Sequence, residues 1–350
     1  MRAHAVAEFR QPLVAIDCSD PIPTGTEVVL EVTRCGVCHT DLHLQDGYYD
    51  LGGGKRLSLA DRGIKPPVVL GHEVLGRLTA KGPDAPIDDA EIGRTFLVYP
   101  WIGCGSCEVC RDGQDNLCTA PRSLGVFRPG GYAGQCLVPH PRYLIPVEGI
   151  DPTVAATYAC SGLTAYSALR KVGIDRERDL LLIIGLGGVG LSAVQIARAL
   201  GFQRIAGVDL ESDKRTTALS QGVTLALDPG DPDAAAKLAQ AGGVAAAIDF
   251  VGTGSTTELA FASLKKGGTC VVVGLFGGEL RIPLPPLVQR AITIRGSYVG
   301  SLGELKELVE LVRTVGVPPL PVEPIAFDDV NIALDRLRAG GVSGRLVLAR

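Results

Sequence analysis

A short apolar run that leads directly into a glycine-rich turn is the feature that most limits how this chain can fold. Leu180–Ile184 consists only of aliphatic residues, as in a strand buried on both faces of a sheet. It is followed by Gly185–Gly190, which matches G-x-G-x-x-G, and by an apolar helical pattern from Leu191 to Leu200. Strand and helix patterns then alternate as far as residue 273. This order predicts a parallel sheet covered by helices on both faces.

The turn has the composition that the phosphates of a dinucleotide require. The first glycine makes the turn, the second lets the backbone approach a pyrophosphate, and the third lets the helix pack closely on the strand. The helix N-terminus adds free N–H groups and a positive dipole. We therefore expect coenzyme contacts at Gly185, Gly187, Gly188, Val189 and Gly190. A tight strand–helix turn that binds no ligand is the alternative.

An acidic residue lies where it would select the coenzyme. Asp209 ends the next strand pattern, 19 residues after Gly190. A carboxylate at this place holds the 2′-hydroxyl of a ribose and repels a 2′-phosphate. The sequence therefore favours NAD(H) over NADP(H).

Composition and charge narrow the classes of protein further. The chain has 350 residues, enough for about two domains, and the first 150 are rich in glycine, proline and β-branched runs, which indicates a β-rich domain. The net charge is −4, which disfavours a nucleic-acid partner. The longest apolar run, 180–194, has 15 residues and is interrupted by glycines, whereas a membrane span needs about 20. We therefore expect a cytoplasmic protein without a membrane partner.

Four of the ten cysteines lie close together in a glycine-containing loop. Cys104, Cys107, Cys110 and Cys118 follow the spacing C-x2-C-x2-C-x7-C. In a reducing compartment, clustered thiols indicate metal ligands rather than disulfides. Four thiolates can close a tetrahedral zinc site of the structural kind, and an iron–sulfur cluster is the main alternative. We expect zinc that ties the loop together.

A second candidate metal site is spread over three motifs. Cys38 lies in G-V-C-H-T-D-L-H, His72 in G-H-E, and Cys160 in C-S-G-L-T-A-Y. Two thiolates, one imidazole and an open fourth position would make a catalytic zinc site. The motifs are far apart along the chain, so their spacing alone does not join them.

Together, these motifs resemble those of the zinc-dependent medium-chain alcohol dehydrogenases almost from end to end, and most of all their microbial, tetrameric branch. The resemblance implies an α/β fold: a β-rich GroES-like catalytic domain, residues 1–161 and 299–350, and a Rossmann NAD-binding domain, residues 162–298. It implies reversible hydride transfer between a primary or secondary alcohol and NAD+, with the aldehyde or ketone as product. It also implies one catalytic and one structural Zn²⁺, and a homotetramer with a dimer as the alternative.

The resemblance further assigns roles to single residues. The catalytic residues that it implies are Cys38, Thr40, His43, His72 and Cys160. Cys38, His72 and Cys160 would hold the catalytic zinc, with Glu73 beside the metal. A proton would pass from the Thr40 hydroxyl through a coenzyme ribose to His43, and Asp41 would orient His72. Beyond the glycine turn, the implied coenzyme contacts are His39, Thr164, Asp209, Lys214 and Arg345.

Other interpretations remain open at this stage. His43 could be a surface histidine, Thr40 a helix cap, and Glu73 the buried partner of an arginine. A polyol dehydrogenase of the same superfamily is an alternative, although those enzymes more often have a glutamate where Cys160 stands. A zinc-ribbon nucleic-acid-binding protein would share the four cysteines, but the acidic balance and the lack of a basic stripe oppose it.

Residues 46–65 are longer than the corresponding segment of compact relatives. The segment lies between two zinc-binding motifs, so we expect it near the mouth of the substrate cleft. Our hypothesis is that Tyr48, Tyr49 and Leu57 shape that cleft, with Tyr99 or Trp101 on another wall. A plain surface loop is the alternative.

Overall fold

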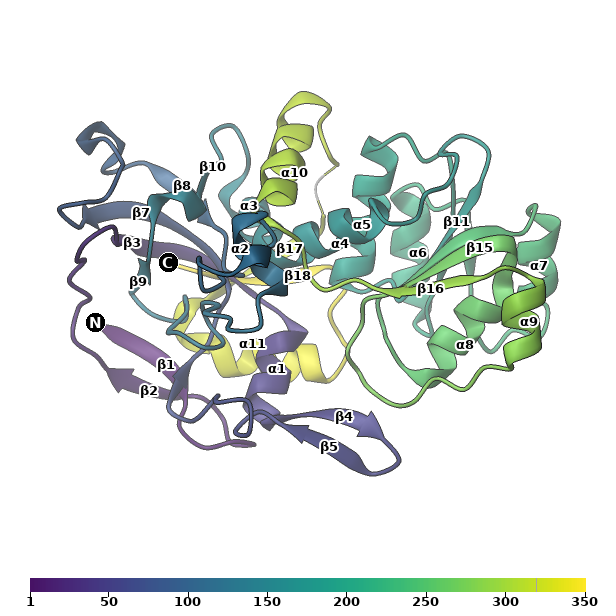
Figure 1. Cartoon of the computed structure of the whole chain (residues 1–350), viewed down its shortest axis with the longest axis horizontal. Coiled ribbons are helices and arrows are strands. Elements are labelled where there is room, and N and C mark those ends of the chain that lie inside the picture. The colour runs from purple at the N-terminus through teal and green to yellow at the C-terminus, as the bar shows by residue number, and fades with distance from the viewer. Residues whose placement is uncertain (319) are drawn as a thin grey trace.

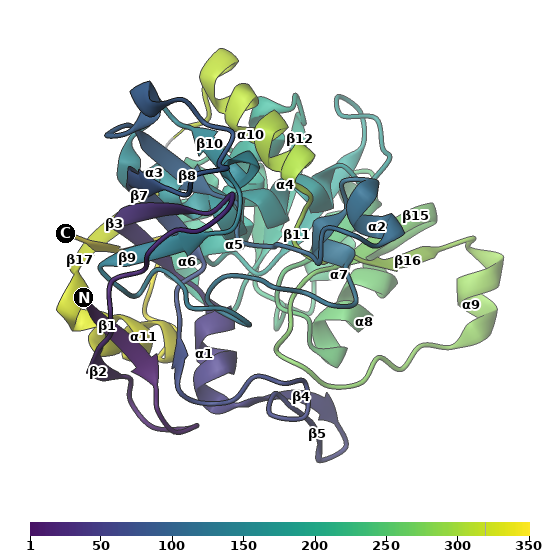
Figure 2. The ribbon, with the colours of Figure 1, turned by 60° about the vertical axis from the view of Figure 1, so that its left-hand side comes forward.

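Two sheet-containing halves lie side by side in the computed structural model, which describes residues 1–318 and 320–350 (Figure 1). One half contains both chain termini and most of the antiparallel strands. The other contains a parallel sheet between two layers of helices (Figures 1 and 2). Alternating strand and helix patterns had predicted the second half, and the β-branched runs had predicted the first.

The half that carries the termini is built on a seven-stranded sheet of order β10-β8-β7-β3-β18-β17, with β9 also paired to β3. Its strands are β3 (Val28–Val37), β7 (Glu73–Lys81), β8 (Thr95–Val98), β9 (Gln135–Val138), β10 (Leu144–Pro146), β17 (Val322–Ala326) and β18 (Arg345–Ala349). A smaller sheet, β2-β1-β6, flanks it; its strands are β1 (Arg2–Val6), β2 (Val14–Asp17) and β6 (Val68–Val69). Strand β18 pairs with β3, so the end of the chain returns to the sheet formed by its beginning.

The other half is a six-stranded parallel sheet of order β13-β12-β11-β14-β15-β16. Its strands are β11 (Leu180–Ile184), β12 (Arg204–Val208), β13 (Leu225–Leu227), β14 (Val244–Asp249), β15 (Leu264–Val272) and β16 (Thr293–Gly296). The strand order changes direction between β11 and β14. In open α/β sheets a ligand binds beyond the carboxyl ends of the strands at such a switch point. The glycine turn follows β11 and therefore lies at this point.

Helices cover both faces of the parallel sheet, as predicted, and the helix after the glycine turn lies close to its predicted residues. These helices are α5 (Gly188–Ala199), α6 (Ser212–Ser220), α7 (Ala234–Gln240), α8 (Gly254–Ser263) and α9 (Leu284–Gln289). Helix α5 begins three residues before the apolar pattern at Leu191. The hydrophobic period marks only the apolar buried face, whereas the first turn contains Gly188 and Gly190, which leave room for Arg345 and for the carbonyl of Gly185.

A single helical segment joins the two halves. It contains α3 (Pro152–Thr157), one π-helical turn (Tyr158–Gly162) and α4 (Leu163–Leu169). The π turn adds a residue to the helical repeat and shifts the side chains that follow, a feature often found at functional sites. Cys160 lies in this turn.

Shorter elements complete the half that carries the termini. Its helices are α1 (His39–Asp46), α2 (Glu108–Arg111), α10 (Leu302–Thr314) and α11 (Val330–Arg338), and its 3-10 turns are η1 (Asp89–Glu91), η2 (Asp115–Leu117), η3 (Pro141–Tyr143) and η5 (Phe327–Asp329). Helix α1 ends at Gly47, whose φ of 80° permits the left-handed cap and whose N–H donates to the carbonyl of His43.

The long segment at 46–65 folds into a two-stranded hairpin, β4 (Tyr48–Gly52) and β5 (Lys55–Ser58). The hairpin extends from the end of α1 below the parallel sheet's half (Figure 1). It is therefore an ordered element and not a loose surface loop. Among the described residues, no helix is both long and apolar enough to cross a membrane.

Replacement of Gly190 by alanine should destabilise the junction between β11 and α5. A Cβ at Gly190 would lie 1.8 Å from the carbonyl oxygen of Gly185, so strand and helix would have to separate. We expect Gly190→Ala to lower the free energy of unfolding by about 1–3 kcal/mol, the usual cost of overpacking. Urea unfolding followed by circular dichroism measures it.

Gly187→Ala is the matched control. A Cβ at Gly187 meets no atom within 4 Å, and its φ of −73° suits any residue. Its free energy of unfolding should stay close to that of the original chain. Equal losses in the two variants would contradict this account of the turn.

Candidate metal and coenzyme sites

Three side chains from separate parts of the chain meet in the interior. Cys38 caps the start of α1, His72 immediately precedes β7, and Cys160 lies in the π turn. All three are buried, and their ligand atoms lie within 4.8 Å of one another. The two sulfur atoms are 3.9 Å apart. Tetrahedral bonds of about 2.3 Å to one ion set a sulfur–sulfur distance of about 3.8 Å, so the residues present fit a zinc ion.

A buried carboxylate orients two of these ligands. Asp41 is fully buried, and its Oδ1 lies 3.4 Å from Nδ1 of His72. Its Oδ2 accepts hydrogen bonds from the backbone N–H of Cys38 at 2.9 Å and from the hydroxyl of Tyr132 at 3.0 Å. Nε2 of His72 is buried and has no hydrogen-bond partner among the described residues. Burial of such an atom without a partner is costly, and a metal ion would satisfy it.

The electrostatics of the pair of thiols also suit a metal. The hydrogen bond from the Cys160 thiol, together with the neighbouring His72 ring, holds the pKa of Cys38 well below its ordinary value, although burial opposes this. A thiolate is the form of cysteine that binds zinc. The surroundings of Cys38 therefore favour its thiolate form, the form that binds zinc.

Glu73 faces an arginine. Its Oε2 lies 2.5 Å from Nη2 of Arg345, and its Oε1 accepts from the backbone N–H of Ser161 at 3.1 Å. Both side chains of the ion pair are almost fully buried. Burial raises the pKa of Glu73 to about 7, against the opposing effect of Arg345. The ligand trio thus gathers without Glu73, whose carboxylate pairs with Arg345.

Arg345 connects this ion pair to the glycine turn. Its Nη2 donates to the carbonyl of Val37 at 3.0 Å, and a Cβ at Gly188 would lie 2.3 Å from its Cδ. Its Nε is buried and has no partner among the described residues. An unpaired guanidinium N–H beside the turn is a suitable donor to a phosphate.

The remaining residues of the G-V-C-H-T-D-L-H motif lie along α1. The hydroxyl oxygen of Thr40 is 3.9 Å from the sulfur of Cys38. The ring of His43 packs against Tyr49 at 4.9 Å between centroids, and that of His39 against Phe276 at 5.1 Å. Burial lowers the pKa of both histidines. Both are half-buried rather than surface side chains.

The glycine turn lies beside Asp209 and close to the start of α6. Asp209 immediately follows β12 and accepts hydrogen bonds from the backbone N–H groups of Leu186 and Glu211, at 2.7 and 2.9 Å. Lys214 lies half-buried in the first turn of α6. The space over Gly187 is open, because a Cβ there would meet nothing within 4 Å.

One further polar atom is unpaired near the ligand trio. Thr164 lies one turn after Cys160, in α4, and its buried hydroxyl has no partner among the described residues. The hydroxyl of Thr164 and Nε of Arg345 can each bind a polar group of a ligand, and the open space over Gly187 lets a ligand approach the backbone of the turn. A dinucleotide fits this arrangement.

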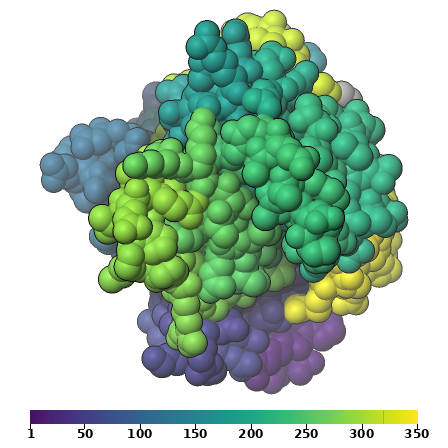
Figure 3. All heavy atoms as spheres, turned by 90° about the vertical axis from the view of Figure 1, so that its right-hand side faces the viewer, coloured from purple at the N-terminus to yellow at the C-terminus, as the bar shows by residue number. Residues whose placement is uncertain are grey.

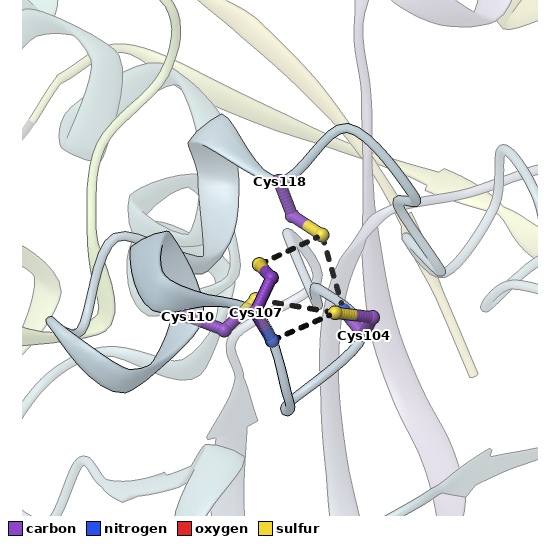
Figure 4. Close-up of side chains that lie close together, drawn as sticks. All are labelled: Cys104, Cys107, Cys110 and Cys118. Atoms are coloured by element: carbon purple, nitrogen blue, oxygen red, sulfur yellow. Dashed lines mark hydrogen bonds between the residues drawn. The ribbon is translucent and has the colours of Figure 1, made fainter.

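The four-cysteine loop gathers its thiols in the predicted way (Figure 4). The sulfur atoms of Cys104 and Cys110 are 4.0 Å apart, and those of Cys107 and Cys118 are 3.8 Å apart. Hydrogen bonds led by the Ser106 backbone lower the pKa of Cys104 to about 5, which favours a thiolate. Backbone N–H groups of Cys104 and Ala120 donate to the sulfur of Cys118, both at 3.3 Å. The group fits a closed tetrahedral zinc site.

A cavity of about 570 Å³ opens between the hairpin and the carboxyl ends of β14 and β15. Tyr49 and Leu57 line it, as predicted. The prediction for Tyr48 is wrong: its ring stacks under Arg56 at 4.1 Å and does not line the cavity. The prediction for Tyr99 is also wrong, because its buried hydroxyl donates to the carbonyl of Gly300. Trp101 packs on the ligand His72 at 5.3 Å between centroids, and its place on a wall of the substrate cleft stays a prediction.

Comparison with known proteins agrees with this geometry. The family "Alcohol dehydrogenase GroES-like domain" matches residues 24–149, and the family "Zinc-binding dehydrogenase" matches residues 188–314. An NAD-dependent alcohol dehydrogenase of Sulfurisphaera tokodaii is 33% identical over 351 residues, with 99% of each chain covered. An alcohol dehydrogenase of the archaeon Aeropyrum pernix has a similar structure, with a TM-score of 0.89, 29% identity and full coverage of both chains. An acetophenone reductase of Geotrichum candidum, solved with NAD, has a TM-score of 0.84 and 32% identity, covering 99% of this chain and 97% of the other.

The chain belongs to the zinc-dependent alcohol dehydrogenases of the medium-chain family. It is an oxidoreductase that transfers hydride between an alcohol and NAD+, with zinc and NAD(H) as its cofactors. The predicted family, fold class, reaction and cofactors are therefore confirmed.

The motifs did not reveal every residue of the site. Tyr132, which donates to Asp41, lies in no recognisable pattern. Arg62 and Tyr298, which line the cavity, were not selected either. The only available signal for Arg62 was its place in the long segment at 46–65, and Tyr298 had none that concerns substrate.

Loss of one thiol from the four-cysteine loop should remove one metal ion and loosen the loop. We expect Cys107→Ala to reduce bound zinc from two ions per chain to about one and to lower the thermal unfolding midpoint, because structural zinc contributes folding free energy. Metal analysis by mass spectrometry and calorimetry measure the two effects. Zinc content equal to that of the original chain would contradict this assignment.

Proposed function

We propose that the alcohol is oxidised at the trio of Cys38, His72 and Cys160, with these residues holding the catalytic zinc. The observation that carries the proposal is their convergence: three zinc-type ligands from distant motifs meet in the interior, and Nε2 of His72 is left without a partner among the described residues. The fourth position of such a site stays free for substrate. Primary and secondary alcohols are the proposed substrates.

The metal, when bound, acts as a Lewis acid that makes an alcohol far easier to deprotonate. This chain's own residues then have to move the proton out of a buried site. Thr40 lies beside Cys38, so its hydroxyl is in place to accept it. His43 lies one helical turn further along α1, and its imidazole can pass a proton to solvent at neutral pH. We assign the relay to these two residues, with a coenzyme hydroxyl between them.

The coenzyme contacts are proposed on the same grounds. Asp209 would hold the adenosine ribose, with Lys214 beside it, and the turn residues Gly185, Gly187, Gly188, Val189 and Gly190 would carry the pyrophosphate. His39 and Arg345 would approach that pyrophosphate from the other side of the cleft. Thr164 would meet the nicotinamide through its unpaired hydroxyl. These contacts support a catalytic domain of residues 1–161 and 299–350 and an NAD-binding domain of residues 162–298.

The family resemblance also supports a homotetramer, or a dimer, that works in the cytoplasm. Light scattering on the purified protein would measure the number of chains. Neither point affects the assignment of the site.

Removal of a proposed catalytic ligand should abolish turnover and leave the four-cysteine zinc in place. We expect Cys160→Ala to bind about one zinc per chain and to lose at least about 1,000-fold in kcat, since the Lewis acid supplies several kcal/mol. Metal analysis and the rate of NADH formation from ethanol or cyclohexanol measure both. Cys136→Ala, at a buried cysteine of β9 outside both clusters, should keep both ions. Full zinc content in Cys160→Ala would refute the assignment.

Neutralisation of Asp209 should weaken the choice between the two coenzymes. We expect Asp209→Asn to raise the NADP+/NAD+ ratio of kcat/KM by about 10- to 100-fold, because the charge that repels a 2′-phosphate is lost. Steady-state kinetics with each coenzyme measure the ratio. Asp213→Asn, at an exposed carboxylate of the helix that follows, is the control and should leave the ratio unchanged. An unchanged ratio in Asp209→Asn would show that another residue selects the coenzyme.

A further inference from the structure

The hairpin of β4 and β5 closes the cavity of about 570 Å³ from the side opposite the parallel sheet. A Cβ at Gly52 would lie 2.6 Å from Cγ of Glu279, and one at Gly277 would lie 2.4 Å from the carbonyl oxygen of Asp50. The hairpin tip is therefore in direct contact with the loop that follows β15. Figure 3 shows the same arrangement at the surface, with the hairpin's purple-blue atoms below the green atoms of the parallel half.

Three hydrogen-bond donors on the cavity wall have no acceptor in the described part of the protein. Arg62, which follows the hairpin, lines the cavity together with Tyr49 and Tyr298. Within residues 1–318 and 320–350, the Arg62 guanidinium makes no ion pair, and neither tyrosine hydroxyl is in a hydrogen bond. Arg62 is exposed and Tyr298 is 51% exposed, so water hydrates both side chains in the absence of a ligand.

The charge of Arg62 acts on both phenols. Burial raises the pKa of Tyr49 to about 12, and the Arg62 guanidinium opposes this rise. For Tyr298, burial raises the pKa and Arg62 again opposes it. Both phenols remain protonated at neutral pH and can donate.

The acidic side chains of the wall are already engaged. Oδ1 of Asp50 accepts a hydrogen bond from the backbone N–H of Gly52 at 2.8 Å. Oε2 of Glu279 pairs with Arg281 at 3.2 Å. Arg62 is the one cationic side chain among the residues that line the cavity in the described part of the chain. The wall therefore offers one cation without an ion pair and two neutral donors, beside the charged carboxylate of Asp50.

The rings of this wall lead to the ligand trio. Tyr298 packs on Trp101 with centroids 6.0 Å apart, and Trp101 packs on His72 at 5.3 Å. On the other side, Tyr49 packs on His43 at 4.9 Å. These ring contacts join the cavity wall to His72 of the ligand trio and to His43.

We propose that the preferred substrate is an ω-hydroxy acid, an alcohol whose far end carries a carboxylate that Arg62, Tyr49 and Tyr298 bind. The proposal rests on the proposed function, because it needs the reacting carbon at the zinc trio. A carboxylate accepts bidentate hydrogen bonds from a guanidinium and further ones from hydroxyl groups. The apolar residues of the hairpin, Leu51 and Leu57, cover the methylene chain between the two ends.

The test compares ω-hydroxy acids of four to six carbons with the alkanols that carry a methyl group in place of the carboxylate. We expect kcat/KM of the best hydroxy acid to exceed that of its alkanol by at least about tenfold in the original enzyme. Arg62→Gln should lower kcat/KM for the hydroxy acid by about 10- to 100-fold through KM, the range for a charged hydrogen bond. Its kcat/KM for the alkanol should stay within about twofold, and Arg62→Lys should recover part of the loss.

A matched control and a binding measurement separate recognition from folding. Arg56→Gln removes a cation of the same hairpin that stacks on Tyr48 outside the cavity, and it should change neither substrate. Calorimetric titration of the zinc enzyme with 5-hydroxypentanoate, without coenzyme, should show weaker binding for Arg62→Gln than for Arg56→Gln.

The test distinguishes failure of the carboxylate site from failure of the proposed function. Alkanols oxidised as well as hydroxy acids at every chain length, or equal effects of Arg62→Gln on both series, would overturn the carboxylate site and leave the proposed function standing. A chain that holds both zinc ions and oxidises neither series with NAD+ would overturn the proposed function, and the carboxylate site with it.

Discussion

The buried ion pair between Glu73 and Arg345 is the interaction on which the rest of the site depends. It touches the chain beside each of the three metal ligands: Glu73 follows His72, Ser161 follows Cys160 and donates to Glu73, and the carbonyl of Val37, next to Cys38, accepts from Arg345. Removal of one partner from a buried pair leaves an uncompensated charge, which typically costs about 3–5 kcal/mol. Strands β3, β7 and β18 and the π turn are thus held in one arrangement.

The same pair links the chemistry to the coenzyme. The aliphatic part of Arg345 lies against Gly188, at the start of α5, so the glycine turn and the ligand trio share one side chain. Gly36 leaves the room that the carboxylate of the pair occupies, since a Cβ there would lie 1.7 Å from Oε2 of Glu73. Gly36 and Gly188 therefore leave the room that lets one ion pair contact both the ligand trio and the glycine turn.

Local sequence predicted those parts of the molecule that local physics determines. Leu180–Ile184 is a buried strand because every side chain is apolar, and the helical pattern after the glycine turn is α5. The four close cysteines needed only a short loop to meet. The ligand trio meets only because β3 pairs with β7 and because the helix contains one π turn. Neither feature can be predicted from the spacing of Cys38, His72 and Cys160 along the chain. Motif resemblance supplied that link.

The cavity wall was the least predictable part. Tyr48 and Tyr49 are neighbours with the same chemistry, yet strand alternation turns one ring to Arg56 and the other to the cavity. A one-residue change of register would exchange them. Arg62 and Tyr298 come from segments far apart in the chain, and only the folded hairpin brings them to one space.

The residues that line the cavity and the residues that hold the metal and coenzyme come largely from different segments of the chain. The metal ligands and the glycine turn belong to the sheets and helices of the core, whereas much of one wall of the cavity comes from a single continuous stretch between α1 and β6. Exchange of that stretch alone would give the enzyme a new repertoire of alcohols with the same hydride chemistry. The hairpin segment could therefore change its sequence while the metal ligands and the glycine turn keep theirs.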